Sequence, residues 1–233
     1  MKYDVIIVGA GPGGIYSAYE LMKKCSDKKI AVFDSGYSLK KRHCPIDGEK
    51  VKACIKCKSC SIMSGFGGAG AFSDGKYNIT NDFGGTLYEY IGKKAATELM
   101  QYVDDINMAH GGEGTKMYST AGTNLKKVCL QNRLKLLNAS VRHLGTDINL
   151  VVLGQLYDEL KEHVDFYFES PVSHIECLEN GGYRVWSNDK SYDCEKCIVS
   201  VGRSGSKWME HICKELDIPT KSNRVDLGVR VEL

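Results

Sequence analysis

Residues 3–14 read Tyr-Asp-Val-Ile-Ile-Val-Gly-Ala-Gly-Pro-Gly-Gly. The apolar run Val5–Val8 is typical of a parallel strand that is covered on both faces. The glycines that follow have the spacing G-x-G-x-x-G: the first permits a tight turn, the second lets the backbone approach a pyrophosphate, and the third lets a helix pack close to the strand. These glycines, with the one at position 13, are Gly9, Gly11, Gly13 and Gly14. We therefore predict that a dinucleotide binds here, with its phosphates at the N-terminus of the following helix.

The residues after this turn distinguish it from a chance glycine pattern. Apolar residues recur at helical spacing from Ile15 to Cys25, and Ile30–Phe33 is a second apolar strand that is followed by Asp34. Asp34 comes 20 residues after the last glycine, a position where an acidic side chain accepts hydrogen bonds from a ribose hydroxyl. A second G-x-G-x-x-G, at residues 65–70, has no apolar strand before it and no amphipathic helix directly after it. The first pattern is therefore the one that predicts nucleotide binding.

Composition limits the classes of protein to consider. Hydrophobic residues make up 42% of the 233 residues, and 31 basic against 29 acidic residues give a net charge of +2. This balance gives no electrostatic footprint for nucleic acid or for an anionic membrane. No apolar run is long enough to span a membrane, and the apolar start is the first strand rather than a signal peptide. We expect a cytoplasmic protein, in which the ten cysteines are reduced thiols, metal ligands or redox groups.

The rest of the chain predicts further helices and strands. A capping box, Thr86 with Glu89, begins a helix predicted over residues 87–109, and we expect the apolar stripe of this helix to face the core. Helices are also predicted at about 124–138, 153–164 and 207–216, and strands at 166–168, 172–178, 183–187, 191–194 and 197–201. The strands between about 171 and 195 form a small antiparallel meander. Residues 35–85 are a long Gly/Cys-rich insertion, and an insertion of this length is usually functional.

Several stretches resemble a known family. They are Arg-His-Cys-Pro at 42–45, the cysteines up to Cys60, Gly-Phe-Gly-Gly-Ala-Gly-Ala-Phe-Ser-Asp-Gly-Lys at 65–76, and Arg-His-Leu-Gly-Thr-Asp at 142–147. Together with the order of elements, they are similar to a family of largely uncharacterised FAD-dependent dehydrogenases in the glutathione-reductase-like flavoprotein superfamily. The similarity extends over essentially the whole chain. It implies an α/β fold: a Rossmann-like FAD/NAD(P)-binding domain over residues 1–225, with a central parallel sheet, the meander and the insertion.

The resemblance also implies particular ligands and site residues. It implies FAD as the bound nucleotide, NAD(P)H as a candidate reductant, and a small-molecule substrate or electron acceptor. Besides the glycine turn, the matching positions are Asp34 at the adenosine ribose, Ser35 and Arg42 beside the nucleotide, Gly67, Gly68 and Ala71 at the flavin end, Val172 at the adenine, and Gly202 on the pyrophosphate side. Residues 226–233 alternate apolar and polar and stop in mid-pattern, so we expect them to begin a truncated substrate domain; the alternative is a terminal edge strand. Catalytic residues and oligomeric state stay open.

A cysteine cluster allows several interpretations. Cys54, Cys57 and Cys60 have the spacing C-x-x-C-x-x-C, and Cys44 precedes them. Such spacing can direct thiolates to an iron-sulfur cluster or to zinc. Residues 40–58 contain seven Lys or Arg against two acidic residues, and positive neighbours favour thiolates. A metal or cluster site, a redox dithiol facing the flavin, and free thiols in a solvated basic loop all remain open.

Two other positions are ambiguous. Cys194 and Cys197 form a second C-x-x-C, which we interpret as packing residues. His143 is either a surface loop residue or a group that titrates beside a flavin substrate. For the whole chain, three hypotheses follow: an FAD-dependent oxidoreductase, a dinucleotide-binding module that is inactive without a substrate domain, and a flavin/iron-sulfur electron-transfer protein.

Overall fold

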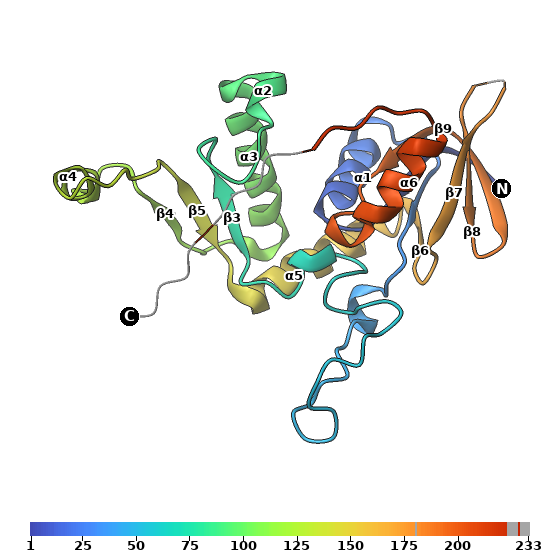
Figure 1. Cartoon of the computed structure of the whole chain (residues 1–233), viewed down its shortest axis with the longest axis horizontal. Helices are drawn as coiled ribbons and strands as arrows, with labels where there is room; N and C mark the ends of the chain where they lie inside the picture. Colours follow the sequence, from blue (N-terminus) through green and yellow to red (C-terminus); the bar gives the residue numbers. More distant parts are fainter. Residues whose placement is uncertain (180, 223–227, 229–233) are drawn as a thin grey trace.

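The computed structural model describes residues 1–179, 181–222 and 228, and its centre is a six-stranded sheet (Figure 1). The strands lie in the order β6-β2-β1-β9-β8-β7. Their bounds are β1 Lys2–Val8, β2 Ile30–Phe33, β6 Val164–Tyr167, β7 Val172–Cys177, β8 Tyr183–Ser187 and β9 Lys190–Val199. The first four strands in this order pair in parallel, whereas β8 and β7 pair antiparallel. The predicted parallel sheet with an antiparallel meander is confirmed.

Both faces of the sheet are covered. Val5 and Ile7 pack with α1 (Pro12–Lys24) and α5 (Gly145–Leu160), while Ile6 and Val8 pack with the meander and α6 (Ser206–Glu215). Successive side chains of a strand point to opposite faces, so a strand that is covered on both sides needs apolar residues at every position. This explains the unbroken apolar run of β1.

The C-terminal part of the meander differs from the prediction. The strands predicted at 191–194 and 197–201 are one strand, β9, which pairs with β8 and lies beside β1 from Asp193 to Val199. Glu195 and Lys196 are exposed within it, and their polarity suggested a loop. Backbone ladder bonds do not depend on apolar side chains, so the strand continues through them.

A second lobe lies beside the sheet (Figure 1); its helices correspond to predicted ones, but its small sheet was not predicted. Three short strands form an antiparallel sheet in the order β3-β5-β4. The elements of the lobe are β3 Lys76–Ile79, α2 Tyr88–Ile91, α3 Lys93–Asn107, β4 Met117–Ser119, α4 Leu125–Gln131 and β5 Ser140–His143. Met108–Gly112 extends α3 as a short π-helical turn. These strands are only three or four residues long and lie far apart in the sequence. The alternation of apolar and polar residues in each is therefore too short to predict a strand.

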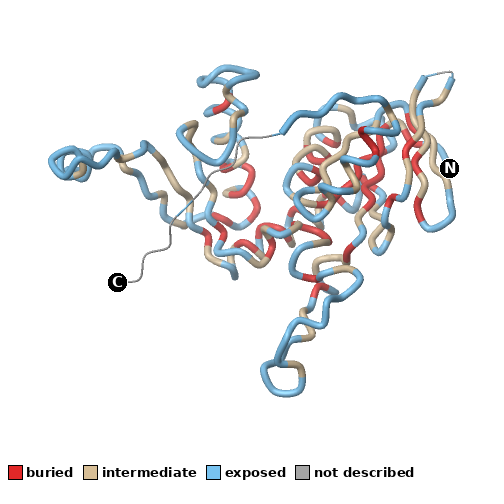
Figure 2. Tube along the Cα trace, in the orientation of Figure 1, coloured by how far each residue is buried: buried red, intermediate tan, exposed pale blue. Residues whose placement is uncertain are grey.

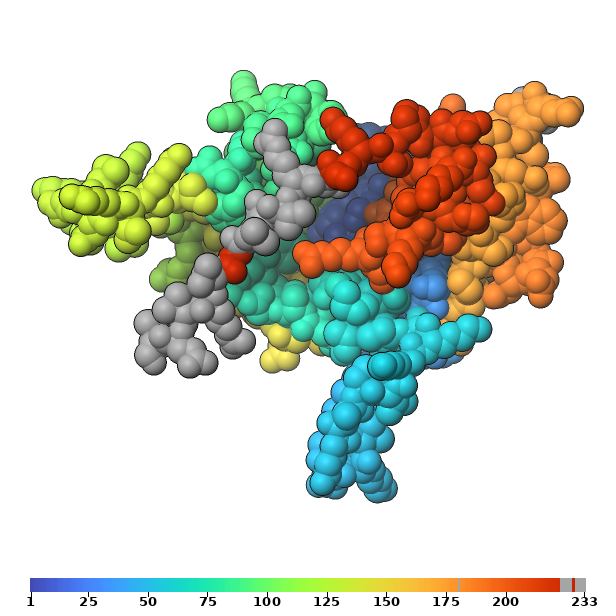
Figure 3. Space-filling view, viewed as in Figure 1, coloured from blue at the N-terminus to red at the C-terminus, as the bar shows by residue number. Residues whose placement is uncertain are grey.

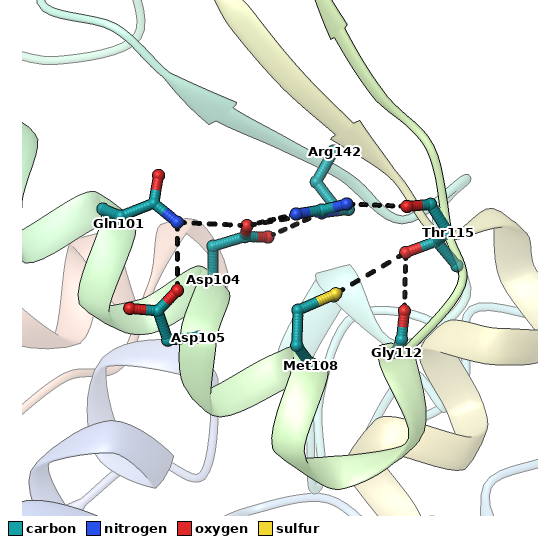
Figure 4. Close-up of polar contacts among 7 residues, drawn as sticks. All are labelled: Gln101, Asp104, Asp105, Met108, Gly112, Thr115 and Arg142. Carbon is teal, nitrogen blue, oxygen red and sulfur yellow. Dashed lines mark hydrogen bonds and ion pairs between the residues drawn. The ribbon is translucent and has the colours of Figure 1, made fainter.

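A buried ion pair joins this small sheet to α3 (Figure 4). The guanidinium of Arg142 donates to both carboxylate oxygens of Asp104, the shortest distance being 2.7 Å, and to the carbonyl of Thr115 at 2.6 Å. Asp104 is only 1% exposed. The hydrogen bond with Asp104 raises the pKa of Arg142. This part of the predicted family motif therefore holds β4 and β5 onto α3.

The predicted helices need correction in extent. The helix predicted over 87–109 is broken at Gly92, whose φ of +81° is in the region that favours glycine, so α2 and α3 are separate. Its stripe does not face the core: Leu87, Ile91 and Leu99 are exposed, and only Ile106 of the predicted stripe is buried. The helix predicted at 124–138 is limited to α4. α5 begins at Gly145, before the predicted position 153.

The insertion contains little regular structure. Within residues 35–85 the structure has two 3-10 turns, Leu39–Lys41 and Gly68–Gly70, and strand β3. Its cysteine-rich part projects from the body of the protein and is exposed over most of its length (Figure 2). Residues 226–233 lie outside the described residues, apart from Gly228, so the predicted start of a substrate domain stays a prediction.

Candidate functional site

A cavity of about 880 Å³ lies at the carboxyl ends of β1, β2 and β9. Its wall contains the turn between β1 and α1, the residues that follow β2, residues 200–205 and Trp208. Parts of the insertion, at 57–60, 63–64 and 68–69, and the start of β7 complete it. In open α/β sheets, ligands bind in the crevice outside the carboxyl ends of the strands. The cavity is therefore where the sequence predicts the dinucleotide.

The glycine residues of the turn place backbone atoms, without side chains, on the cavity wall. Gly9 has a φ of +106°, and a Cβ added there would lie 2.2 Å from the carbonyl oxygen of Ser200. A Cβ on Gly14 would lie 1.9 Å from the carbonyl oxygen of Gly9. Gly11 is the N-cap of α1; it has no side chain to cap the helix, and the first turn of α1 contains no acidic residue. Pro12, the first residue of α1, has no N–H, so the N–H groups of Gly13 and Gly14 are the ones available to an anion.

Asp34 connects three separate backbone segments. Its Oδ1 accepts hydrogen bonds from the N–H groups of Gly36 at 2.7 Å and Gly65 at 2.8 Å, and its Oδ2 accepts one from Ala10 at 2.8 Å. Asp34 also belongs to the cavity wall. An ionised carboxylate has about four acceptor sites, so three internal bonds leave one for a ribose hydroxyl. The carboxylate is first of all a clamp between the glycine turn and the insertion.

The second glycine cluster packs directly on the first. The N–H of Gly67 donates to the carbonyl of Ala10 at 2.8 Å. A Cβ on Gly36 would lie 2.3 Å from the backbone nitrogen of Gly65, and one on Gly68 would lie 3.0 Å from the Cα of Gly11. Backbone-to-backbone contact of this kind requires glycine on at least one side. The cluster thus forms one wall of the cavity next to the β1–α1 turn.

Arg42 lies outside the cavity lining. Its buried guanidinium donates to the carbonyls of Ser61 at 2.8 Å, Ile62 at 2.9 Å and Phe66 at 2.6 Å, and it stacks over the ring of Phe72. Burial lowers its pKa, partly offset by the charge of Asp34. The structure gives Arg42 the role of holding residues 61–66 in place, and two of these, Met63 and Ser64, line the cavity.

Two polar atoms on the wall have no partner. The hydroxyl of Ser59 and the indole Nε1 of Trp208 are buried and make no hydrogen bond with any described residue. Both residues line the cavity. Buried polar groups are nearly always hydrogen-bonded, so these atoms fit a ligand that supplies the missing partners. Neither position carried a signal in the sequence.

The structure brings most of the predicted nucleotide residues to one place. The cavity wall contains Gly9, Gly11, Gly13, Asp34, Ser35, Gly68, Val172 and Gly202, whereas Gly14, Arg42, Gly67 and Ala71 lie behind it. Ala71 is fully buried, and a Cβ on Gly67 would touch Leu153 of α5 at 2.8 Å. His143 is exposed at the end of β5 and is not part of the wall.

The predicted metal site is not formed. No three His, Cys, Asp or Glu side chains in the described part of the chain are grouped so that they could hold a metal ion. The four thiols are not all at one place: Cys57 and Cys60 line the cavity, whereas Cys44 and Cys54 do not. All four are free thiols.

Cys194 and Cys197 lie in a different part of the protein. Both belong to the apolar cluster between the meander and α6, Cys194 as a buried member and Cys197 packed against it. A hydrogen bond with Cys194, together with burial, raises the pKa of the Cys197 thiol. The interpretation of this pair as packing residues is confirmed.

Fold and cavity together define a class: the chain has the fold of the FAD-binding Rossmann-like domains, an α/β domain with a mostly parallel six-stranded sheet and a three-stranded antiparallel sheet. No family model matches the chain. A protein of Clostridium beijerinckii, described as uncharacterized, is 24% identical over 234 residues, which is 100% of this chain and 37% of that protein.

Solved structures are similar at low sequence identity. Glycine oxidase from Geobacillus kaustophilus has a TM-score of 0.51 and 15% identity, over 93% of this chain and 58% of that one. L-alpha-glycerophosphate oxidase from Mycoplasma pneumoniae, with FAD bound, has a TM-score of 0.48 and 16% identity, over 92% of this chain and 57% of that one. The chain thus spans 37% of the Clostridium protein and little more than half of either oxidase. None of the helices within residues 1–179 and 181–222 has the length and apolar content to cross a membrane.

Proposed function

We propose that the cavity binds FAD and that the chain is the cofactor-binding part of an FAD-dependent oxidoreductase. The observation that carries this proposal is the convergence of three features on one cavity: the bare glycine turn at the N-terminus of α1, a carboxylate at the end of β2, and two buried polar atoms without partners. A glycine turn without a cavity beside it, or with side chains filling that cavity, would have excluded the proposal. The fold of FAD-binding domains supports the same conclusion.

The residues of the wall have distinct roles in this proposal. Gly9, Gly11 and Gly13 leave the first N–H groups of α1 open to the pyrophosphate. The remaining acceptor site of Asp34, with Ser35 beside it, serves the ribose. FAD, when bound, supplies hydride transfer, and the protein supplies position and electrostatics. We further propose NAD(P)H as reductant and a small molecule as substrate or electron acceptor.

A titration of the purified protein with FAD, NAD⁺ and ADP, followed by flavin or tryptophan fluorescence, tests the proposal. The chain has two tryptophans, which provide a matched pair of variants. Trp208→Phe removes the unpartnered Nε1 from the wall, and we expect FAD binding about five- to tenfold weaker, the equivalent of one hydrogen bond. Trp186→Phe is the control, because the Nε1 of Trp186 donates to Glu176, away from the cavity. Equal effects of the two variants, or no binding of FAD, would overturn the proposal.

A dinucleotide-binding module without its own activity is the second candidate, and one observation favours it. The ionisable side chains on the described cavity wall are those of Asp34, Cys57, Lys58, Cys60 and Arg203. The only carboxylate among them already accepts three backbone hydrogen bonds, so the wall offers no free carboxylate as a general base. If ADP binds as tightly as FAD, and NAD(P)H with an artificial acceptor gives no turnover, this second candidate is the correct one.

A further inference from the structure

One end of the second lobe projects from the protein as a convex protrusion. It consists of β4, α4, the start of β5 and their connections, residues 116–141, and we call it the basic lobe. Figures 1 and 3 show it extending away from the six-stranded sheet, with α4 at its tip. α4 contains no buried residue. The basic lobe therefore adds little to the core of the protein.

The basic lobe carries positive charge, and its own sequence contains no acid; the carboxylate of Asp82, from outside the lobe, accepts the backbone N–H of Asn138 at 3.0 Å. No Asp or Glu occurs between Glu113 and Asp147. The cations of the lobe are Lys116, Lys126, Lys127, Arg133 and Lys135, all of them exposed. None of these five takes part in an ion pair with another described residue. The near-neutral total charge of the chain hides this local excess.

Large apolar side chains are exposed among these cations. Leu130 is 64% exposed and Leu134 61%, and Leu125, Val128 and Tyr118 are each at least half exposed. Scattered single apolar residues are normal on a protein surface, but here five lie within 17 residues of one protrusion. Aliphatic side chains among Lys and Arg are typical of segments that enter the interface of a membrane.

The convex shape of the basic lobe favours a membrane over a protein as its partner. A protein that covered a convex tip would need a matching acidic groove, whereas a bilayer deforms around inserted side chains. Anionic headgroups also supply the charge that five unpaired cations lack. We propose that the basic lobe binds the surface of anionic lipid membranes, with Leu130 and Leu134 inserted below the headgroups. This replaces the expectation, drawn from total charge, that no membrane is a partner, and it does not depend on FAD.

Flotation of the full chain with vesicles tests the proposal. We expect binding to vesicles of phosphatidylcholine with phosphatidylserine, and little binding to phosphatidylcholine alone. Lys126→Glu with Lys127→Glu removes two cations and adds two anions, so the partition coefficient falls by at least roughly 30-fold. Lys93→Glu with Lys94→Glu is the matched control: two adjacent exposed lysines on α3, for which binding stays within about twofold of the unmodified chain.

A second pair of variants separates insertion from simple charge attraction. Leu130→Ser with Leu134→Ser keeps every charge, and we expect binding at least tenfold weaker because less apolar area enters the bilayer. Both side chains are exposed, so the melting temperature of the protein should stay the same. Equal binding to neutral and anionic vesicles would overturn the proposal. So would a dimer of the unmodified chain that the leucine variant abolishes, because the lobe would then be an interface between copies.

Discussion

Asp34→Asn tests the clamp between the glycine turn and the insertion. In the protein, one carboxylate oxygen accepts hydrogen bonds from the N–H groups of Gly36 and Gly65, and the other oxygen accepts a hydrogen bond from the N–H group of Ala10. Asparagine has the same shape but only one oxygen. In either orientation of the amide, at least one backbone N–H then faces an NH₂ group instead of an acceptor.

The size of this effect follows from the bonds that are lost. A hydrogen bond to a charged group contributes about 1.5–3 kcal/mol, and an N–H group left without an acceptor adds to the cost. One lost bond and one unpaired N–H give a destabilisation of about 3 kcal/mol. For a chain of this length, that corresponds to a fall in melting temperature of about 6–12 °C.

The assay is thermal unfolding of the protein without added nucleotide. Asp4→Asn is a suitable control, because Asp4 also accepts a backbone N–H, that of Lys29 at 2.7 Å, but on the protein surface; we expect a much smaller change. A different result would refute the reasoning: if Asp34→Asn weakens FAD binding and leaves the melting temperature unchanged, the carboxylate serves the ribose alone and is no clamp.

Three further predictions follow, two from contacts described above and one from the contacts of Glu159 with Lys23 at 2.7 Å and His110 at 2.8 Å. Gly14→Ala places a Cβ against the carbonyl oxygen of Gly9, so we expect about 3 kcal/mol of destabilisation in urea unfolding and loss of FAD binding. Arg142→Met leaves the carboxylate of Asp104 buried and unpaired, which costs about 3–5 kcal/mol and increases hydrogen exchange in the three-stranded sheet. Hydrogen bonds from Lys and His lower the pKa of Glu159 below its ordinary 4.5, so its contribution to stability is present above that pH and is lost as pH falls through the lowered pKa. When the pH is lowered from about 5 to about 3, the melting temperature of Glu159→Gln should therefore fall less than that of the unmodified chain.

Each of these predictions has a control or a contrary outcome. Gly154→Ala in α5 places a Cβ in open space, so it should keep or slightly raise stability. Arg184→Met breaks an ion pair with Asp193 that is more than one-third exposed, and its effect should be far smaller than that of Arg142→Met. An acid-unfolding curve that Glu159→Gln does not change would show that this carboxylate is not linked to folding.

The sequence was informative where structure is local. The β1 strand, the glycine turn and α1 follow from one contiguous stretch, and the structure confirms them there. The break in the helix predicted at 87–109 is also local in origin, at Gly92, but the apolar stripe is exposed on both sides of the break, at Leu87 and at Leu99. Periodicity shows that a face is apolar, but not what covers it.

Contacts between distant segments could not be predicted. The clamp by Asp34 depends on Gly65, which lies 31 residues further on, and the unpartnered atoms of Ser59 and Trp208 become visible only when three segments form one wall. The cysteine spacing suggested convergence of the thiols, but Cys57 and Cys60 line the cavity while Cys44 and Cys54 do not, and spacing in sequence does not fix the course of an irregular insertion. The same limitation hid the three-stranded sheet.

The continuity of β9 couples the two ends of the cavity. The strand begins in the meander and ends at Val199, and the next residue, Ser200, donates its N–H to the carbonyl of Val8 at 2.7 Å. The carbonyl of Ser200 in turn fills the space where Gly9 lacks a Cβ. Val172, at the start of β7, is connected to this turn through the paired strands β7, β8 and β9. A substitution that displaces β9 would therefore also move the Ser200 carbonyl relative to Gly9, so opposite ends of the cavity wall are mechanically linked.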